Sequence, residues 1–339
     1  MTMSDQVTDL IIYIPTYNRL SKLDNCLKII SREIKGYESR VKVFVSNNGS
    51  TDGTLEFLKN LKKDWLTFQS HENNQEAFLN VIGAFDLHLK GKFVWIVGDD
   101  DYLMPGSIAE LLFHIQESPE IDFIFCNTTA FPADQSDAII STYLKNGEIG
   151  IGNIKSNIFK DIEKVDFEKL IDPRIADTLL AELMVLCFRQ EKFNFRYDKA
   201  ISIDNELKSA LKGGVCCISD EARFRVPHTL ALIENIKFNT PSLYLPNPKT
   251  FNFWGSATEW LGDYDFVFPI VLLFLIKEYK SKEIISYIKY IELLSYYFQI
   301  MNQSFYRQWK GESSAKIFTD AVKSEFFDAL FELNLMSRH

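Results

Sequence analysis

Two kinds of hydrophobic pattern alternate along the first 126 residues of the chain. Four short apolar runs, rich in β-branched and aromatic residues and bounded by turn formers, are typical of buried parallel strands. They cover Leu10–Pro15, Val41–Val45, Lys92–Val97 and Ile121–Cys126. Between them, apolar residues recur every three or four positions, which predicts amphipathic helices. This strand–helix alternation predicts a doubly wound, mostly parallel α/β sheet with right-handed crossovers.

Local signals also mark where two of these helices begin. Ser50 and Thr51 precede the periodic stretch at 55–61. Ser107 and Glu110 have the spacing of a capping box, in which two side chains reciprocally cap backbone N–H groups at a helix start. We therefore expect a capped helix after residue 106.

The rest of the chain divides into a polar middle and a helical end. Residues 131–171 are polar and lack a clear period, so we expect loops and short helices there that shape an acceptor site. A short helix at 202–211 and a strand at 215–218 follow, and three helical stretches cover 266–280, 284–302 and 315–335. We predict a sheet domain over 1–228 and a mostly helical region over 229–339. Core packing best explains the aromatic residues of this region, and oligomer or membrane-surface contacts are the alternatives.

Composition and charge exclude several classes of protein. The 339 residues are 46% hydrophobic and 24% charged, which is typical of a globular protein with a real core. The net charge is −9 and no long basic run occurs, so duplex nucleic acid is not the expected partner. The five cysteines show no Cys-x-x-Cys spacing, which favours a reducing compartment. No signal peptide is visible and the longest apolar run is too short to span a bilayer, so we expect a cytoplasmic protein.

Polar clusters follow three of the predicted strands. If the strands are parallel, all three clusters lie at the edge of the sheet where α/β proteins bind their ligands. The clusters are Pro15-Thr16-Tyr17-Asn18-Arg19, Ser46-Asn47-Asn48-Gly49-Ser50-Thr51-Asp52-Gly53 and Gly98-Asp99-Asp100-Asp101.

The triple aspartate is the sharpest chemical feature. Three adjacent carboxylates repel one another, and a cation normally offsets them when they are held close together. Oxygen ligands suit Mg²⁺ or Mn²⁺, and such ions usually bridge one or two carboxylates to substrate phosphates. The alternative is a solvated acidic turn that only caps the following helix.

The other two clusters offer groups that suit a nucleotide. The side-chain amides of Asn47 and Asn48 can read the edge of a base, although Asn-Gly is also a turn signal in its own right. Tyr17 can stack on a base or simply pack, and Arg19 can meet a phosphate or face solvent.

Four stretches together resemble the inverting family 2 glycosyltransferases, which have the GT-A fold. They are Ile11–Arg19, Val43–Thr54, Glu72–Gly83 and Phe93–Pro105, and their order and spacing fit the family. The Gly-Asp-Asp-Asp form is similar to bacterial enzymes of O-antigen and capsule synthesis, including abequosyltransferase-like members. The resemblance covers the first 120 residues well, extends more weakly to about residue 228, and does not cover the last hundred.

The resemblance implies how a nucleotide-sugar would lie on the strand ends. Pro15, Thr16, Tyr17 and Arg19 would line the nucleotide, and Asn48 would face the base. The family often has aspartate in place of Asn48, so the resemblance does not fix the base.

The resemblance also implies roles for the aspartates. Asp101 would bind Mn²⁺ or Mg²⁺ together with the donor diphosphate. Asp99 would lie nearer the ribose or sugar and serve as a second metal ligand, with Asp100 beside it.

An acidic motif further along the family pattern supplies a catalytic base. Its match here is Ile203-Asp204-Asn205-Glu206-Leu207, so Asp204 would accept the proton of the acceptor hydroxyl. Glu206 is the second candidate, and the alternative for Asp204 is an N-cap of the following helix. His228 lies where some relatives place a histidine near the metal.

The sequence therefore predicts a metal-dependent inverting glycosyltransferase. It would move a sugar from a nucleotide diphosphate sugar to a hydroxyl of a saccharide acceptor, in surface polysaccharide synthesis. The aromatic helices fit a lipid-linked acceptor at the inner face of the cell membrane. Two alternatives stay open, namely a nucleotidyltransferase and a non-catalytic nucleotide- or sugar-binding protein.

Overall fold

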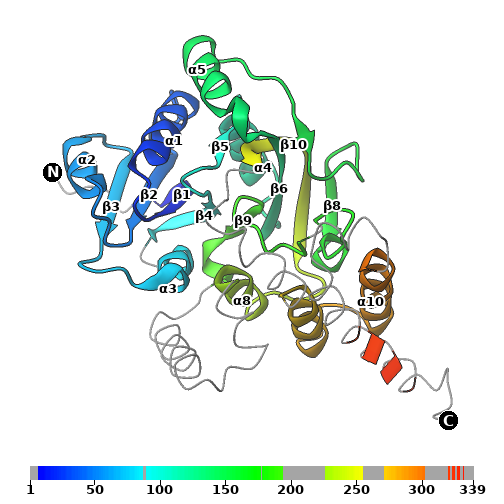
Figure 1. Cartoon of the computed structure of the whole chain (residues 1–339). Coiled ribbons are helices and arrows are strands. Elements are labelled where there is room, and N and C mark those ends of the chain that lie inside the picture. The colour runs from blue at the N-terminus through cyan, green and yellow to red at the C-terminus, as the bar shows by residue number, and fades with distance from the viewer. Residues whose placement is uncertain are drawn as a thin grey trace.

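A computed structural model describes residues 7–86, 89–176, 178–193, 226–254 and 271–301, together with 320, 323, 324, 327, 328 and 331. Over this part of the chain the fold is one ten-stranded mixed sheet with helices on both faces (Figure 1). The predicted doubly wound α/β class is confirmed. The predicted elements at 202–211 and 215–218 lie outside the described residues.

The first half of the sheet is entirely parallel, in the order β3-β2-β1-β4. Three of its strands were predicted from their apolar runs, but β3 was not. Strand β3 lies at the edge of the sheet, and only its first residue is buried. Its other positions alternate between exposed and half-exposed, so they leave no continuous apolar run. The strands are β1 (Thr8–Thr16), β2 (Val41–Asn47), β3 (Leu66–Ser70) and β4 (Gly91–Ile96).

The second half of the sheet mixes strand directions. Strand β9 (Leu186–Arg189) lies between β4 and β6 (Phe123–Pro132) and is antiparallel to both. The ends of β4 and β6 therefore lie at the same sheet edge as the beginning of β9. Strand β10 (Pro241–Trp254) pairs parallel with β6, so the sheet continues beyond residue 228. Where the chain divides into domains stays a prediction.

Three short strands complete the sheet. Strand β5 (Tyr102–Leu103) and strand β8 (Glu163–Asp166) both run antiparallel to β10, and β7 (Asn153–Ile154) pairs antiparallel with β6. The region 131–171 thus contains strands as well as the loops and short helices that we expected.

Side chains of β1 alternate between the two covered faces, as a central strand requires. Leu10, Ile12 and Ile14 belong to one hydrophobic cluster and Ile11 and Tyr13 to the other. The helices of the first cluster are α1 (Leu20–Glu33), α4 (Ser107–Glu117) and α5 (Ser136–Asn146), with α2 (Thr54–Asn60) beside them (Figure 1). The second cluster contains residues of α3 (Glu76–Ile82), α8 (Pro227–Ile233), the helix at 271–281 and α10 (Tyr287–Met301).

The described C-terminal helices pack on the sheet domain. Tyr279 and Leu293 are buried, whereas Ile288 on α10 is exposed. Core packing is therefore the role that the structure shows for this part of the chain. No helix among the described residues is both long and apolar enough to cross a bilayer.

The predicted capping box at the start of α4 is wrong. Gly106, with φ +78°, is the N-cap residue. The Ser107 hydroxyl points to the carbonyl oxygens of Met104 and Lys249, and Glu110 binds Lys249 Nζ at 2.8 Å. The two side chains tie the helix to β10 because Lys249 lies within reach of both.

Candidate functional site at the ends of the parallel strands

The loop after β4 is folded back on itself by its last aspartate. The Gly98 N–H donates to Asp101 Oδ2 at 3.1 Å. A Cβ at position 98 would lie 2.6 Å from that oxygen, so the Asp101 carboxylate would have to move to admit any larger residue. Asp101 is only 6% exposed as a result.

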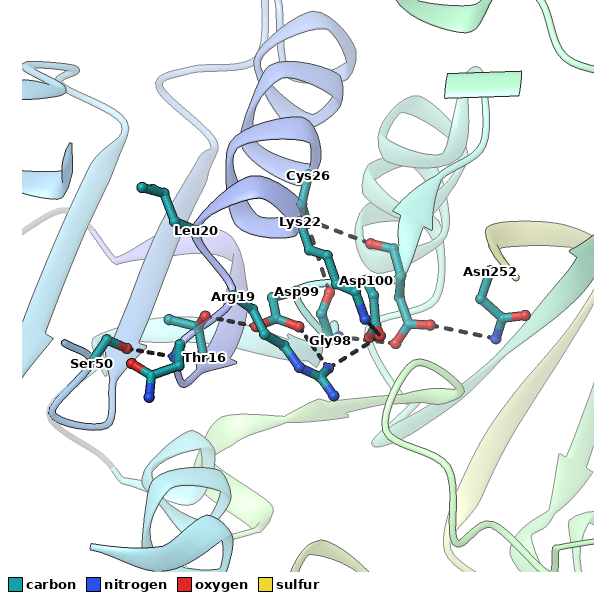
Figure 2. A network of polar contacts seen from close by, with 12 residues as sticks. Thr16, Arg19, Leu20, Lys22, Cys26, Ser50, Gly98, Asp99, Asp100 and Asn252 are labelled. Atoms are coloured by element: carbon teal, nitrogen blue, oxygen red, sulfur yellow. Dashed lines mark hydrogen bonds and ion pairs between the residues drawn. The ribbon is translucent and has the colours of Figure 1, made fainter. Parts of the chain in front are cut away.

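The predicted clusters after β1 and β4 meet through direct contacts (Figure 2). Thr16 Oγ1 donates to Asp99 Oδ2 at 2.7 Å, and Arg19 Nη1 lies 3.2 Å from Asp99 Oδ1 and 3.1 Å from Asp100 Oδ2. Lys22 Nζ also binds Asp100 Oδ2, at 3.1 Å. We did not predict Lys22, although its place three residues after Arg19 puts both cations on one face of the start of α1.

Burial and like charge make this cluster electrostatically unfavourable. Burial, together with the charge of Asp100, raises the pKa of Asp99 to about 6 and that of Asp101 to about 8. Arg19 and the Thr16 hydroxyl partly offset the effect at Asp99. Among the described residues, the Asp101 carboxylate receives the Gly98 N–H and a long contact of 3.5 Å from Asn252 Nδ2. A cation beside Asp101 would therefore be strongly stabilised.

The loops after β1 and β2 are tied together. Asn18 Oδ1 accepts the Thr51 N–H at 2.7 Å, and the Asn18 N–H donates to Ser50 Oγ at 2.9 Å. Asp52 accepts the N–H groups of Leu20 at 2.8 Å and Thr54 at 3.1 Å, so one carboxylate caps the starts of α1 and α2. The two loops consequently form one support for the aspartate cluster.

The two predicted base-reading amides are buried among protein partners. Asn47 Nδ2 donates to Ser70 Oγ at 2.9 Å. Asn48 Nδ2 donates to Asn74 Oδ1 at 2.8 Å, and Asn48 Oδ1 accepts the Gln75 N–H at 2.8 Å. In the structure both amides brace the loop after β2, and a contact of either with a base stays a prediction.

The remaining nucleotide residues lie at the end of β1. Thr16 is buried beside Asp99, Pro15 is half-buried, and the Tyr17 side chain is 41% exposed. An exposed ring at this edge is placed where a base can stack on it, and this role stays a prediction for Tyr17.

His228 lies at the start of α8, and its ring faces a backbone carbonyl group. Its Nε2 lies 2.9 Å from the Ala181 carbonyl oxygen, to which it donates in the neutral form. Burial lowers the pKa of His228 to about 4, so the ring is neutral at pH 7. Its role as a metal ligand stays a prediction. Asp204 and Glu206 lie outside the described residues.

The aspartate cluster has the donor chemistry for Mg²⁺ or Mn²⁺. Within the described residues, no group of three or more His, Cys, Asp or Glu side chains is arranged to hold a metal. One or two carboxylates are, however, what Mg²⁺ usually takes from a protein, with substrate phosphates and water completing the shell. Asp101 and Asp99, both buried and with raised pKa values, fit that requirement.

Comparison with known proteins finds similarity to one family over part of the chain. Residues 11–164 match the family model Glycosyl transferase family 2. Abequosyltransferase RfbV of Salmonella typhimurium is 29% identical over 111 residues, which make up 32% of this chain and 33% of the relative. The match thus spans about a third of the relative's length. Over this region the predicted resemblance is confirmed.

Solved structures share the fold. The S. aureus TarS 1–349 complex with UDP-GlcNAc matches with a TM-score of 0.54 at 16% identity, covering 93% of this chain and 82% of TarS 1–349. The corresponding complex with UDP matches with a TM-score of 0.52 at 14% identity, covering 98% and 93%. These matches confirm the predicted GT-A fold.

Proposed function

We propose that this chain, whose residues 11–164 match the family 2 glycosyltransferase model, transfers a sugar from a nucleotide diphosphate sugar to a hydroxyl of a saccharide acceptor. We place the reaction in surface polysaccharide synthesis, a placement that the partial similarity to an abequosyltransferase supports. One observation carries the proposal. Asp99 and Asp101 are buried with raised pKa values at the edge where three parallel strands end.

The donor nucleotide would lie across the ends of β2 and β1, with its diphosphate at the aspartate loop after β4. Arg19 and Lys22 stand beside that loop, where they bind Asp99 and Asp100 in the free protein. Their charges suit the diphosphate, on which negative charge increases as the bond to the sugar breaks. We assign Arg19 and Lys22 to stabilisation of that leaving group.

A divalent metal completes the proposal. Asp101, with Asp99, would hold Mn²⁺ or Mg²⁺, and the bound ion would act as a Lewis acid toward the diphosphate. The like-charge repulsion among the three aspartates supports this assignment, because a cation relieves it.

The base is assigned to Asp204, on the strength of the sequence motif alone. As the acceptor oxygen forms its bond to the anomeric carbon, Asp204 takes the hydroxyl proton and the bond from that carbon to the diphosphate oxygen breaks. The nucleoside diphosphate leaves on the opposite side, so the anomeric centre is inverted. Glu206 is the second candidate for this role.

Release of nucleoside diphosphate tests the function directly. The protein is incubated with Mn²⁺ and, in turn, UDP-, GDP-, CDP- and dTDP-linked sugars, with and without an oligosaccharide acceptor mixture. We expect one donor class to release its nucleoside diphosphate, faster with acceptor than with water. The Asp101→Asn variant is the control for contaminating hydrolases.

Two other results would replace the proposal. Formation of pyrophosphate from a nucleoside triphosphate and a sugar phosphate would indicate a nucleotidyltransferase. Tight nucleotide binding without release from any donor would indicate a binding protein. The acceptor, its lipid carrier and association through the C-terminal helices stay predictions.

A further inference from the structure

The loop before β9 is held in an unfavourable backbone conformation. Leu179 and Leu180 have φ values of +50° and +67°, a region that branched L-residues rarely adopt. Such conformations persist only where the surroundings enforce them, and they concentrate at functional sites. The hydroxyl of Thr178, in the same loop, is buried and has no hydrogen-bond partner within the described part of the chain.

Four side chains from distant segments enforce this loop by binding its carbonyl oxygens. Two of them come from α8, one from β4 and one from the helix at 271–281, so three parts of the fold converge on the same six residues. The contacts are Tyr279 Oη to Leu179 O at 2.9 Å, Thr229 Oγ1 to Leu180 O at 3.3 Å, His228 Nε2 to Ala181 O at 2.9 Å and Trp95 Nε1 to Met184 O at 2.8 Å.

This loop presents one charged side chain, Glu182. Its Oε1 lies 2.5 Å from Lys155 Nζ, and the exposed fractions of the two side chains are 27% for Glu182 and 14% for Lys155. The Lys155 N–H donates to the Thr128 carbonyl oxygen of β6 at 2.9 Å, which fixes the lysine on the neighbouring strand. A partly buried pair of this kind is costly to desolvate and is a weak source of stability.

The strand order places Glu182 beside the aspartate loop. Strand β9 is antiparallel to β4, so the residues just before β9 lie next to the loop just after β4. The Cys126 N–H of β6 donates to the Val185 carbonyl oxygen at 3.1 Å, which holds the loop at that edge. The negative charge of Glu182 is accordingly close enough to contribute to the raised pKa of Asp101.

The order of the strands also indicates which part of the donor would lie over which strand. Across the edge the strands run β2, β1, β4, β9 and β6, about 4.8 Å apart. With the nucleoside over β2 and β1 and the diphosphate over β4, the transferred sugar reaches the beginning of β9 and the neighbouring part of β6. Glu182 and Lys155 are the charged pair at that point.

We propose that Glu182, aligned by Lys155, binds hydroxyl groups of the transferred sugar and selects among donor sugars. This inference rests on the proposed glycosyltransferase function. An ionised carboxylate only accepts hydrogen bonds, so it suits a sugar that presents two neighbouring hydroxyl groups. A sugar that lacks them leaves the carboxylate unpaired, and sites of this kind discriminate strongly.

The test separates binding of the sugar from binding of the nucleotide. Dissociation constants are measured by calorimetry with Mn²⁺ for UDP, GDP, CDP and dTDP and for UDP-glucose, GDP-mannose, CDP-glucose and dTDP-glucose. For the nucleotide that binds the wild type, Glu182→Gln should keep the diphosphate affinity within about twofold. It should weaken the sugar-bearing form by about tenfold or more, the loss expected for hydrogen bonds to a charged group.

Two further variants complete the design. Lys155→Met should weaken only the sugar-bearing form, by a smaller factor, because the carboxylate remains. Glu120→Gln is the matched control, since Glu120 forms a 2.6 Å pair with Lys164 before the start of β6, at the opposite edge. It should leave both affinities unchanged. If Glu182→Gln does not fold, Glu182→Asp should give the same split because its carboxylate is withdrawn by one methylene.

The failures are distinguishable. If no nucleotide binds the wild type, the glycosyltransferase proposal fails and this inference fails with it. If Glu182→Gln binds both ligand classes as the wild type does, or loses both together, Glu182 is not a sugar-binding residue, while the proposed function stands.

Discussion

Two groups of charged residues lie at opposite edges of the same strands. At the edge where β1 begins, Asp9 accepts Arg40 Nε at 2.6 Å and Lys92 Nζ at 2.7 Å. At the edge where the strands end, Asp99, Asp100 and Asp101 share Arg19 and Lys22. The residue types are the same, but the ratio of acids to cations is reversed.

The pKa values record the difference. Partial burial raises the pKa of Asp9, but the hydrogen bonds and charges of Lys92 and Arg40 outweigh it and the net pKa is lowered. The pKa values of Asp99 and Asp101 are raised, because burial and the charge of Asp100 prevail. At the starting edge the two cations offset the carboxylate, whereas the end edge keeps an excess of negative charge that a bound cation would offset, as is common at functional sites.

The largest expected effect comes from removing the acidic group at the end edge. Asp101→Asn should reduce sugar transfer by about 10³-fold, because a metal contributes several kcal/mol of transition-state stabilisation. Asp9→Asn should leave transfer within about twofold of the wild type, since surface ion pairs contribute little. Equal losses in initial-rate assays of the two variants would break the comparison.

Removing the proposed base should have the next largest effect. Asp204→Asn should lower turnover by at least about 10², the range of general base catalysis, and leave nucleoside diphosphate binding unchanged. Single-turnover rates and calorimetry measure the two quantities. Full turnover in Asp204→Asn, with a loss in Glu206→Gln, would move the base to Glu206.

The pH dependence of stability should differ between the edges. The pKa of Asp101 is about 8 in the folded protein, so its native state binds a proton that the unfolded chain releases near pH 4. The folded protein therefore loses stability as pH rises from about 4 to 8. In EDTA at pH 8, Asp101→Asn should raise the free energy of unfolding by about 1–3 kcal/mol, and at pH 4 by almost nothing. Urea unfolding that shows the same pH slope in both proteins would contradict this expectation.

The smallest effect is expected at the starting edge, with the opposite sign. Because the pKa of Asp9 is lowered in the folded protein, its ion pairs stabilise above the unfolded pKa and are lost as pH falls through the native pKa. Asp9→Asn should lower the free energy of unfolding at pH 7 by about 0.5–1 kcal/mol, less in high salt. Urea unfolding at low and high salt measures it, and a gain in stability would refute the account of this edge.

The sequence was sufficient to predict the strands that are buried on both faces. Strands β1, β2, β4 and β6 appear as continuous apolar runs, and the clusters after β1 and β4 are in direct contact in the structure. Because the strands are parallel, their ends lie at one edge of the sheet. The apolar run of each strand and the polar cluster after it are therefore enough to predict that these clusters lie together.

Strand β10 shows why other parts escaped prediction. It contains Pro241, Pro246 and Pro248, which argue against a strand. The structure accommodates the last two where the pairing with β6 shifts register, between Leu245 and Thr250. Such an irregularity depends on the partner strand and leaves no periodic signal.

Two residues near the aspartates escaped prediction for a similar reason. Asn252 on β10 contacts Asp101, and Glu182 in the loop before β9 is close enough to affect the pKa of Asp101. Both are distant from the aspartates in the chain, and only the strand order brings them near. A single polar residue within an apolar segment does not reveal which residues it will contact.

Thermal unfolding with nucleotides tests the central claim most directly. The protein is melted with UDP, GDP, CDP and dTDP, each with Mn²⁺ and each with EDTA, because a ligand that binds only the folded state raises its apparent stability. We predict that one nucleotide raises the melting temperature with Mn²⁺ and that EDTA removes the shift. A protein that no nucleotide stabilises, at concentrations well above those at which donors bind, would contradict the donor site at the ends of the parallel strands.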